Sequence, residues 1–154
     1  MIAGSEKHNL LATRGTSRCT MKVVALHYQI LHGKPYALPL CDIRVLGRTG
    51  AASLKVLIDS GADFPVFPIK AAEDAGIELP SYPNLWVQYG GSVTAGRRTD
   101  AVIVVGEKRL RLSVVFVQKL EFPYGLLGRI GVFSQFNEVT FLEKMKLPRV
   151  ELRS

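Results

Sequence analysis

An acidic residue follows directly on an apolar segment in the first half of the chain. Residues 56–58 are Val, Leu and Ile, and the next four are Asp59, Ser60, Gly61 and Ala62. This order predicts a carboxylate at the end of a buried strand, beside a hydroxyl group and a glycine that lets the backbone turn. Asp59 is then either a chemical group of an active site or the side chain of an Asx turn that satisfies local N–H groups. These four residues alone leave both interpretations open.

Other familiar chemistries have no support in the sequence. It contains no glycine-rich phosphate loop followed by lysine, no dinucleotide fingerprint and no serine in a G-x-S-x-G elbow. The histidines His8, His27 and His32 lack ligand spacing, because His27 and His32 would face opposite sides of one strand. Cys19 and Cys41 are too few and too far apart for a zinc site or a disulfide framework. We therefore expect no metal, no cofactor and a reducing compartment, by default the cytoplasm.

The charge of the chain is basic but dispersed. Its 154 residues hold 20 Lys and Arg against 13 Asp and Glu, a formal charge of +7, and 47% are hydrophobic, enough for one compact domain. The excess is divided among residues 1–21, 97–111 and 143–153, so a solvated surface is favoured over a nucleic-acid partner. No apolar run approaches the roughly 18 residues that span a bilayer, so no membrane partner is expected.

The first residues differ in composition from the rest. Residues 1–21 contain no continuous hydrophobic stretch before a cleavage site, which argues against a secretory signal. We expect them to form a disordered extension of a domain over residues 22–154. Their Arg, Ser and Thr content leaves an organellar presequence as the alternative.

The elements that must position Asp59 are short and strand-like. Gly90–Gly96 and Gly106–Lys108 are expected to join neighbouring strands, and helical sequence is confined to Ile69–Ala75, before Gly76, and to Ile130–Phe136. Many short strands with few helices predict an all-β barrel or sandwich. Strands are predicted over Val23–Leu31, Leu38–Leu46, Ser53–Ile58, Leu85–Tyr89, Arg98–Val105, Arg109–Val117, Gly125–Gly128, Val139–Leu142 and Leu147–Leu152.

Two motifs in order resemble those of the retropepsin-like aspartic proteases. Asp59-Ser60-Gly61-Ala62 resembles their catalytic Asp-Thr/Ser-Gly-Ala, and Leu126-Leu127-Gly128-Arg129 resembles their second signature, a hydrophobic pair followed by Gly-Arg. The resemblance extends from about Lys22 to Leu152 and departs at Ile130, where many relatives have an acidic or amide residue. It implies an all-β, closed barrel-like acid-protease fold with a flap hairpin and one or two short helices, forming a symmetric dimer.

The resemblance also implies an activity, that of an aspartic endopeptidase. This chemistry needs two carboxylates that share a proton, and the chain has one Asp-Ser-Gly-Ala, so Asp59 would pair with Asp59 of a second copy in a homodimer. Like charges this close cannot both ionise cheaply, so activity is expected to peak below neutral pH. A peptide or protein substrate would lie extended between this pair and the flap hairpins.

The resemblance assigns roles to individual residues. Asp59, Ser60 and Gly61 are implied to be catalytic, and Leu127, Gly128 and Arg129 to be structural, with Arg129 pairing with Asp63. Tyr89 is interpreted equally well as an ordinary strand aromatic. The residues implied to bind substrate are Ala62, Asp63, Phe64, Val87, Tyr89, Gly90, Gly91 and Ser92, with Val93 as a further pocket residue.

Two other functions stay open from the sequence. One is a catalytically inactive dimeric binding module of the same fold, in which Asp59 is structural. The other is a basic β-barrel that binds nucleic acid, which would need exposed aromatic residues among its cations. Its contacts would be Arg97, Arg98, Lys108, Arg109 and Arg111, where no aromatic residue is interleaved.

Overall fold

Strands make up most of the protein, as the sequence predicts. The computed structural model describes residues 22–89 and 91–154; the predicted extension over residues 1–21 and Gly90, one of the residues implied to bind substrate, lie outside the described residues. Among the described residues, no helix is long and apolar enough to cross a lipid bilayer. The elements are β1 (Val23–His27), β2 (Gln29–Ile30), β3 (Ala37–Leu38), β4 (Leu40–Leu46), β5 (Ala51–Ile58), β6 (Val66–Pro68), α1 (Ile69–Ala75), β7 (Leu85–Tyr89), β8 (Ser92–Val105), β9 (Lys108–Val117), β10 (Gly125–Leu127), the 3-10 turn η1 (Phe133–Gln135), β11 (Glu138–Leu142) and β12 (Arg149–Arg153).

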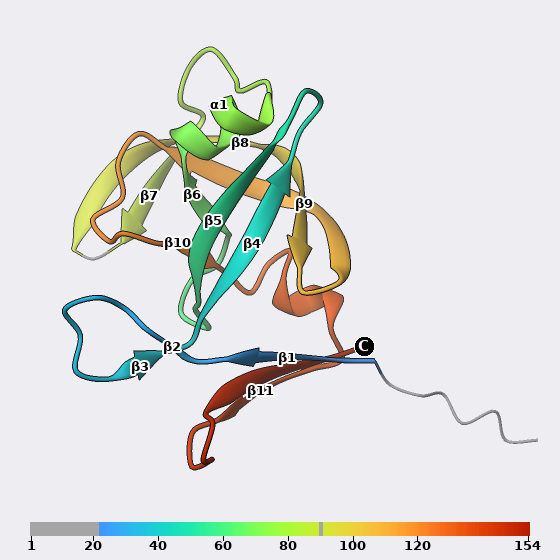
Figure 1. The fold of residues 1–154 in the computed structure, drawn as a ribbon. Coiled ribbons are helices and arrows are strands. Elements are labelled where there is room, and N and C mark those ends of the chain that lie inside the picture. The colour runs from blue at the N-terminus through green and yellow to red at the C-terminus, as the bar shows by residue number, and fades with distance from the viewer. Residues whose placement is uncertain (1–21, 90) are drawn as a thin grey trace, which may run out of the picture.

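One large sheet carries the central part of the fold (Figure 1). Its seven strands follow the order β4-β5-β10-β6-β9-β8-β7, and β4 also pairs with β8. The strand β10 runs parallel to β5 and antiparallel to β6, so it lies between two strands that are consecutive in the chain. The loop between β5 and β6 is thereby held beside the end of β10. A closed barrel stays a prediction.

Alternating side chains give this sheet a buried face. In β4, Ile43 and Val45 are buried while Asp42 and Arg44 are exposed, which is the period of two that a half-buried strand requires. The main core includes an edge-to-face contact between the rings of Phe67 and Phe116, whose centroids lie 6.1 Å apart. A second, smaller cluster, which includes Leu40, Val66, Val115, Tyr124 and Leu126, lies on the side of the sheet that carries the candidate site.

The predicted helix is confirmed with the same bounds. It follows Pro68, whose fixed φ suits a helix start, and it ends at Gly76, which adopts a left-handed conformation with φ of 69°. Ala72 and Ala75 are fully buried in the contact with the sheet. Small side chains let the helix approach closely, since a Cβ at Gly47 would lie only 2.0 Å from the carbonyl oxygen of Ala75.

The two ends of the described chain form a sheet of their own. β1 and β11 both pair antiparallel with β12, which therefore lies in the centre. In Figure 1 this terminal sheet forms a separate layer at one end of the larger sheet. Its inner face packs Val150 and Leu152 into the main core.

Three sequence predictions about local structure are wrong in detail. Val23–Leu31 is not one strand, because pairing with β12 ends at His27 and the next two strand residues pair with β3. Ser92–Gly96 is not a connecting loop but the start of the long strand β8. Of Ile130–Phe136, only Phe133–Gln135 is helical, as a single 3-10 turn.

Candidate active site

Backbone hydrogen bonds fix the position of Asp59. β5 ends at Ile58, which is in register with Leu127 of the parallel strand β10. The N–H of Asp59 donates to the carbonyl oxygen of Leu127 at 3.1 Å, and the carbonyl oxygen of Asp59 accepts from the N–H of Ala62 at 3.3 Å. Asp59 is therefore held where two neighbouring strands end together.

The carboxylate of Asp59 makes a local hydrogen bond. Its Oδ1 accepts from the N–H of Gly61 at 2.8 Å, which is the contact of an Asx turn. The residue is nevertheless only half-buried, and it lines a cleft. The structural and the catalytic interpretations of Asp59 are thus compatible. Its Oδ1 accepts the hydrogen bond of the turn, and the residue also lines the cleft.

The second motif binds the loop that carries Asp59. The N–H of Arg129 donates to the carbonyl oxygen of Ala62 at 2.9 Å, and the N–H of Ile130 donates to that of Asp63 at 2.7 Å. The predicted ion pair is also present, because Arg129 Nη2 lies 2.9 Å from Asp63 Oδ1, with side chains that are 60% and 63% exposed. The two sequence motifs are therefore parts of one structural unit.

The cleft beside Asp59 has a volume of about 620 Å³. Of the residues predicted for the site, the cleft brings together Asp59, Gly61, Ala62, Asp63, Phe64 and Val87. Ser60 is exposed and does not line it, and Val93 does not line it either, being 63% exposed. Its other walls are mostly apolar and come from Leu57, Val66, Leu85, Trp86, Gln88, Val115, Phe122, Tyr124 and Leu126.

A hairpin of β7 and β8 forms one wall of the cleft. Tyr89 and Ser92 pair across its tip, and Gly91 has φ of 85°, a conformation that favours glycine. Val87, in β7, is half-buried and packs against the smaller core cluster. Gly91 and Ser92 lie at the tip and are not in the lining of the cleft, whereas the role predicted for the Tyr89 side chain lies outside the described part of the structure.

Tyr124 is a cleft residue that the sequence prediction missed. Its ring stacks on that of Phe122 with centroids 5.4 Å apart and planes 4° from parallel, and the residue is only 9% exposed. Burial raises the pKa of the Tyr124 phenol, and the charge of nearby Asp59 adds to this effect. The signal available was the pair of aromatics around Pro123, directly before the second motif.

Two other features lie apart from this cleft. Cys41 is buried in β4, and burial raises the pKa of its thiol to about 12, so it is not a reactive nucleophile. A second hollow of about 640 Å³ is lined by Arg48, Arg109 and Arg111 together with Glu78 and Asp100. Within the described part of the chain, no group of three His, Cys, Asp or Glu side chains is placed to hold a metal ion.

The comparison with solved structures concerns the whole fold. A retropepsin-like aspartic protease from Rickettsia conorii superposes with a TM-score of 0.53 over 88% of this chain and 96% of that chain, at 12% sequence identity. The chain shares the retropepsin-like fold. EIAV protease complexed with the inhibitor HBY-793 gives a TM-score of 0.48 over 65% of this chain and 88% of that chain, at 17% identity. No protein-family model and no curated protein matches the sequence. The retropepsin-like fold is thus established by structure, and the residue roles must be argued from the cleft itself.

Proposed function

We propose that the protein is an aspartic endopeptidase whose active site is completed by a second copy of the chain. The observation that carries this proposal is the position of Asp59, a half-buried carboxylate that borders a largely apolar cleft and is anchored by the backbone of the second motif. A shape-selective cleft with few polar groups suits an extended peptide. The retropepsin-like fold supports the same function.

The chemistry explains why a second copy is needed. One ionised carboxylate takes a proton from water as the water oxygen attacks the peptide carbonyl carbon, while a protonated carboxyl gives its proton to the carbonyl oxygen. The carboxyl that took the proton of water then donates it to the leaving nitrogen as the C–N bond of the tetrahedral intermediate breaks, and the other carboxylate takes a proton back from a hydroxyl of the intermediate. Asp59 and Asp63 are the carboxylates in the described lining of the cleft, and Asp63 is paired with Arg129. The second catalytic carboxylate is therefore Asp59 of another subunit, across a twofold axis.

The neighbouring residues take supporting roles in this proposal. Ser60 braces the paired loops, and Gly61 leaves room for the substrate backbone. Ala62, Asp63, Phe64 and Val87 border the bound peptide, and the hairpin tip with Tyr89, Gly91 and Ser92 closes over it. Leu127 and Arg129 hold the loop of Asp59 in place through the hydrogen bonds described above, and Gly128 lets the two segments approach closely.

The substitution Asp59→Asn tests the catalytic assignment. It preserves the size of the side chain and the acceptor for the Gly61 N–H but removes the charge that activates water, so cleavage of a peptide library should fall on the order of a thousandfold or more. Cleavage is followed by mass spectrometry between mildly acidic and neutral pH, and the fold by circular dichroism. Asp74→Asn, on the exposed side of α1, is the matched control and should remain fully active. Undiminished cleavage by pure Asp59→Asn protein would refute the proposal.

A further inference from the structure

A single arginine stands beside the cleft wall that Phe64 provides. The guanidinium carbon of Arg98, in β8, lies 4.7 Å from the centroid of the Phe64 ring. Its Nε–H donates to the hydroxyl oxygen of Ser113, in β9, at 2.8 Å. A cation over an aromatic face and a hydrogen bond from one edge together fix the plane of the guanidinium group.

The backbone of Arg98 is also held in place. The side chain of Asn84, just before β7, accepts from the Arg98 N–H at 2.7 Å and donates to the Arg98 carbonyl oxygen at 3.1 Å. These two hydrogen bonds join the start of the hairpin of β7 and β8 to the position of the arginine in β8. The guanidinium group is therefore preorganised rather than free to move with a long side chain.

The partners of Arg98 leave its charge uncompensated. Phe64 and Ser113 are neutral, whereas Arg129 and Arg111 have carboxylates within 4.0 Å, Asp63 and Asp100 respectively. None of the ion pairs among residues 22–89 and 91–154 includes Arg98. A guanidinium group has five N–H donors, and the hydrogen bond to Ser113 uses one of them. The remaining donors are available to a planar anion such as a carboxylate.

We propose that Arg98 selects peptide substrates with an acidic side chain some residues away from the scissile bond. The inference rests on the proposed function, because it requires a peptide that lies in the cleft and passes Phe64. Phe64 borders the cleft, whereas Arg98 lies over the Phe64 ring and is not itself in the lining, so Arg98 acts away from the reacting bond. In a twofold dimer each subunit supplies one Arg98. The preference for Glu or Asp then falls on both sides of the scissile bond, at similar distances from it.

Matched peptides test this preference. Cleavage of a peptide library first locates the preferred positions, and pairs of peptides that differ only by Glu or Gln at one such position are then compared. Wild-type protein should cleave the Glu peptide with a kcat/KM at least threefold higher, the size expected of a partly exposed charge-assisted contact. This ratio should decrease as salt is raised from 50 to 500 mM, concentrations at which screening lengths are about 14 and 4 Å.

Variants assign the effect to Arg98. Arg98→Met retains a flexible apolar stem over Phe64 and should bring the Glu-to-Gln ratio close to one while cleavage of the Gln peptide stays within about twofold. Arg98→Glu should reverse the preference toward a Lys peptide, and Arg98→Lys should retain part of it. Arg111→Met is the matched control, because Arg111 is an exposed arginine on β9 that pairs with Asp100 rather than with the cleft residue Phe64, and it should leave the ratio unchanged.

The outcomes separate this inference from the proposed function. If wild-type protein cleaves both peptides equally and Asp59→Asn cleaves neither, the protease proposal stands and the role of Arg98 is refuted. If wild-type protein cleaves no peptide in the library, the proposed function itself fails. A preference that persists in a folded Arg98→Met variant also overturns the assignment, because another group must then recognise the acid.

Discussion

Position 128 requires glycine because the backbone of Phe64, in the loop between β5 and β6, lies too close for a side chain. A Cβ atom there would lie 2.6 Å from the carbonyl carbon and 2.7 Å from the carbonyl oxygen of Phe64. These atoms belong to the loop that the second motif binds, and a backbone cannot move aside as a flexible side chain can. The close approach of the two segments is what allows the Arg129 N–H to reach Ala62.

Gly128→Ala should therefore destabilise the fold and displace the loop of Asp59. We expect the free energy of unfolding in urea to fall by about 2 kcal/mol or more, in the range of overpacked sites. Gly33→Ala is the control, because Gly33 has φ of 81° but a Cβ there would meet nothing within 4 Å, so only backbone strain of about 1 kcal/mol is expected. Equal losses for both variants would contradict the close-contact explanation.

The sequence could predict those residues of the site that lie in its two motifs. Asp59, Gly61 and the Gly128-Arg129 pair are recognisable because their roles depend on neighbours in the chain. The sequence does not assign Tyr124 or Arg98 to the site, because their positions depend on how distant strands pair. Arg98 reaches Phe64 only through the register that sets β8 beside β9 and β9 beside β6.

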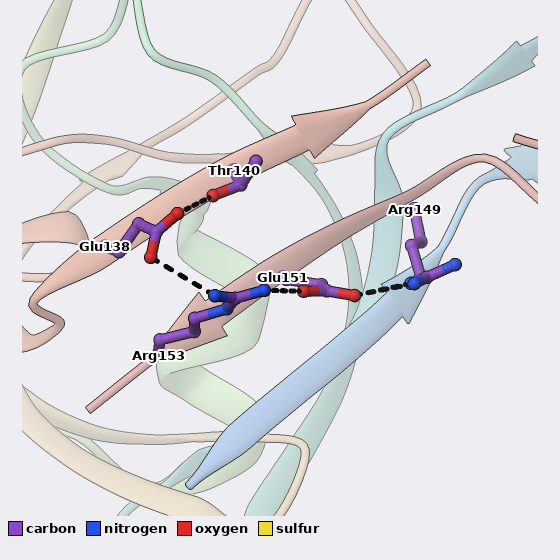
Figure 2. Close-up of polar contacts among 5 residues, drawn as sticks. All are labelled: Glu138, Thr140, Arg149, Glu151 and Arg153. Carbon is purple, nitrogen blue, oxygen red and sulfur yellow. Dashed lines mark hydrogen bonds and ion pairs between the residues drawn. The ribbon is translucent and has the colours of Figure 1, made fainter. Parts of the chain in front are cut away.

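At the scale of elements, the terminal sheet carries a row of charges on its central strand. Arg149, Glu151 and Arg153 alternate along β12 and so point to the same face, where both arginines bind the carboxylate of Glu151 at 2.7 Å. Figure 2 shows this row continuing from Arg153 to Glu138 on β11. The side chain of Glu151 is only 10% exposed. Hydrogen bonds from Arg153 and Arg149 lower the pKa of Glu151 below its usual value of 4.5.

This lowered pKa predicts a loss of stability in acid. A carboxyl group whose pKa is lower in the folded state stabilises the fold above its unfolded pKa, and the contribution disappears as the pH falls through the folded value. Glu151→Gln should thus lower the free energy of unfolding at pH 7, and the gap to wild type should narrow below about pH 4. Urea titrations at several pH values measure this gap. Glu78→Gln is the control, since Glu78 is 81% exposed and its loss should matter little. A gap that is constant with pH would contradict the role of the charge.

Sequence patterns located the elements better than they located their ends. The helix Ile69–Ala75 and the strand Leu85–Tyr89 have the predicted bounds, because Gly76 and the hairpin turn end them locally. The apolar residues that continue past His27 predict one unbroken strand over Val23–Leu31. The break arises from the partners, because the end of β1 at His27 lies opposite the first residue of β12, Arg149, and β2 pairs with β3 instead. Pairing with distant strands cannot be predicted from the sequence of one segment alone.

In the whole molecule, one chain supplies one of the two carboxylates that the proposed reaction needs. Asp59 is a single copy of the motif, and the other carboxylate in the described lining of the cleft, Asp63, is engaged by Arg129. The proposed activity therefore depends on subunit concentration, as for any site that assembly completes.

Mixing wild-type and Asp59→Asn chains tests this dependence directly. If both subunits must supply a carboxylate, then after subunit exchange with a threefold excess of Asp59→Asn, only about one quarter of the wild-type chains have a wild-type partner. Activity per wild-type chain should fall to about one quarter at a total concentration where dimers prevail, which sedimentation velocity verifies. A threefold excess of the active Asp74→Asn variant should cause no such loss. If activity per wild-type chain is unchanged by Asp59→Asn in mixtures that demonstrably exchange subunits, then each chain holds a complete site and the shared pair of carboxylates is excluded.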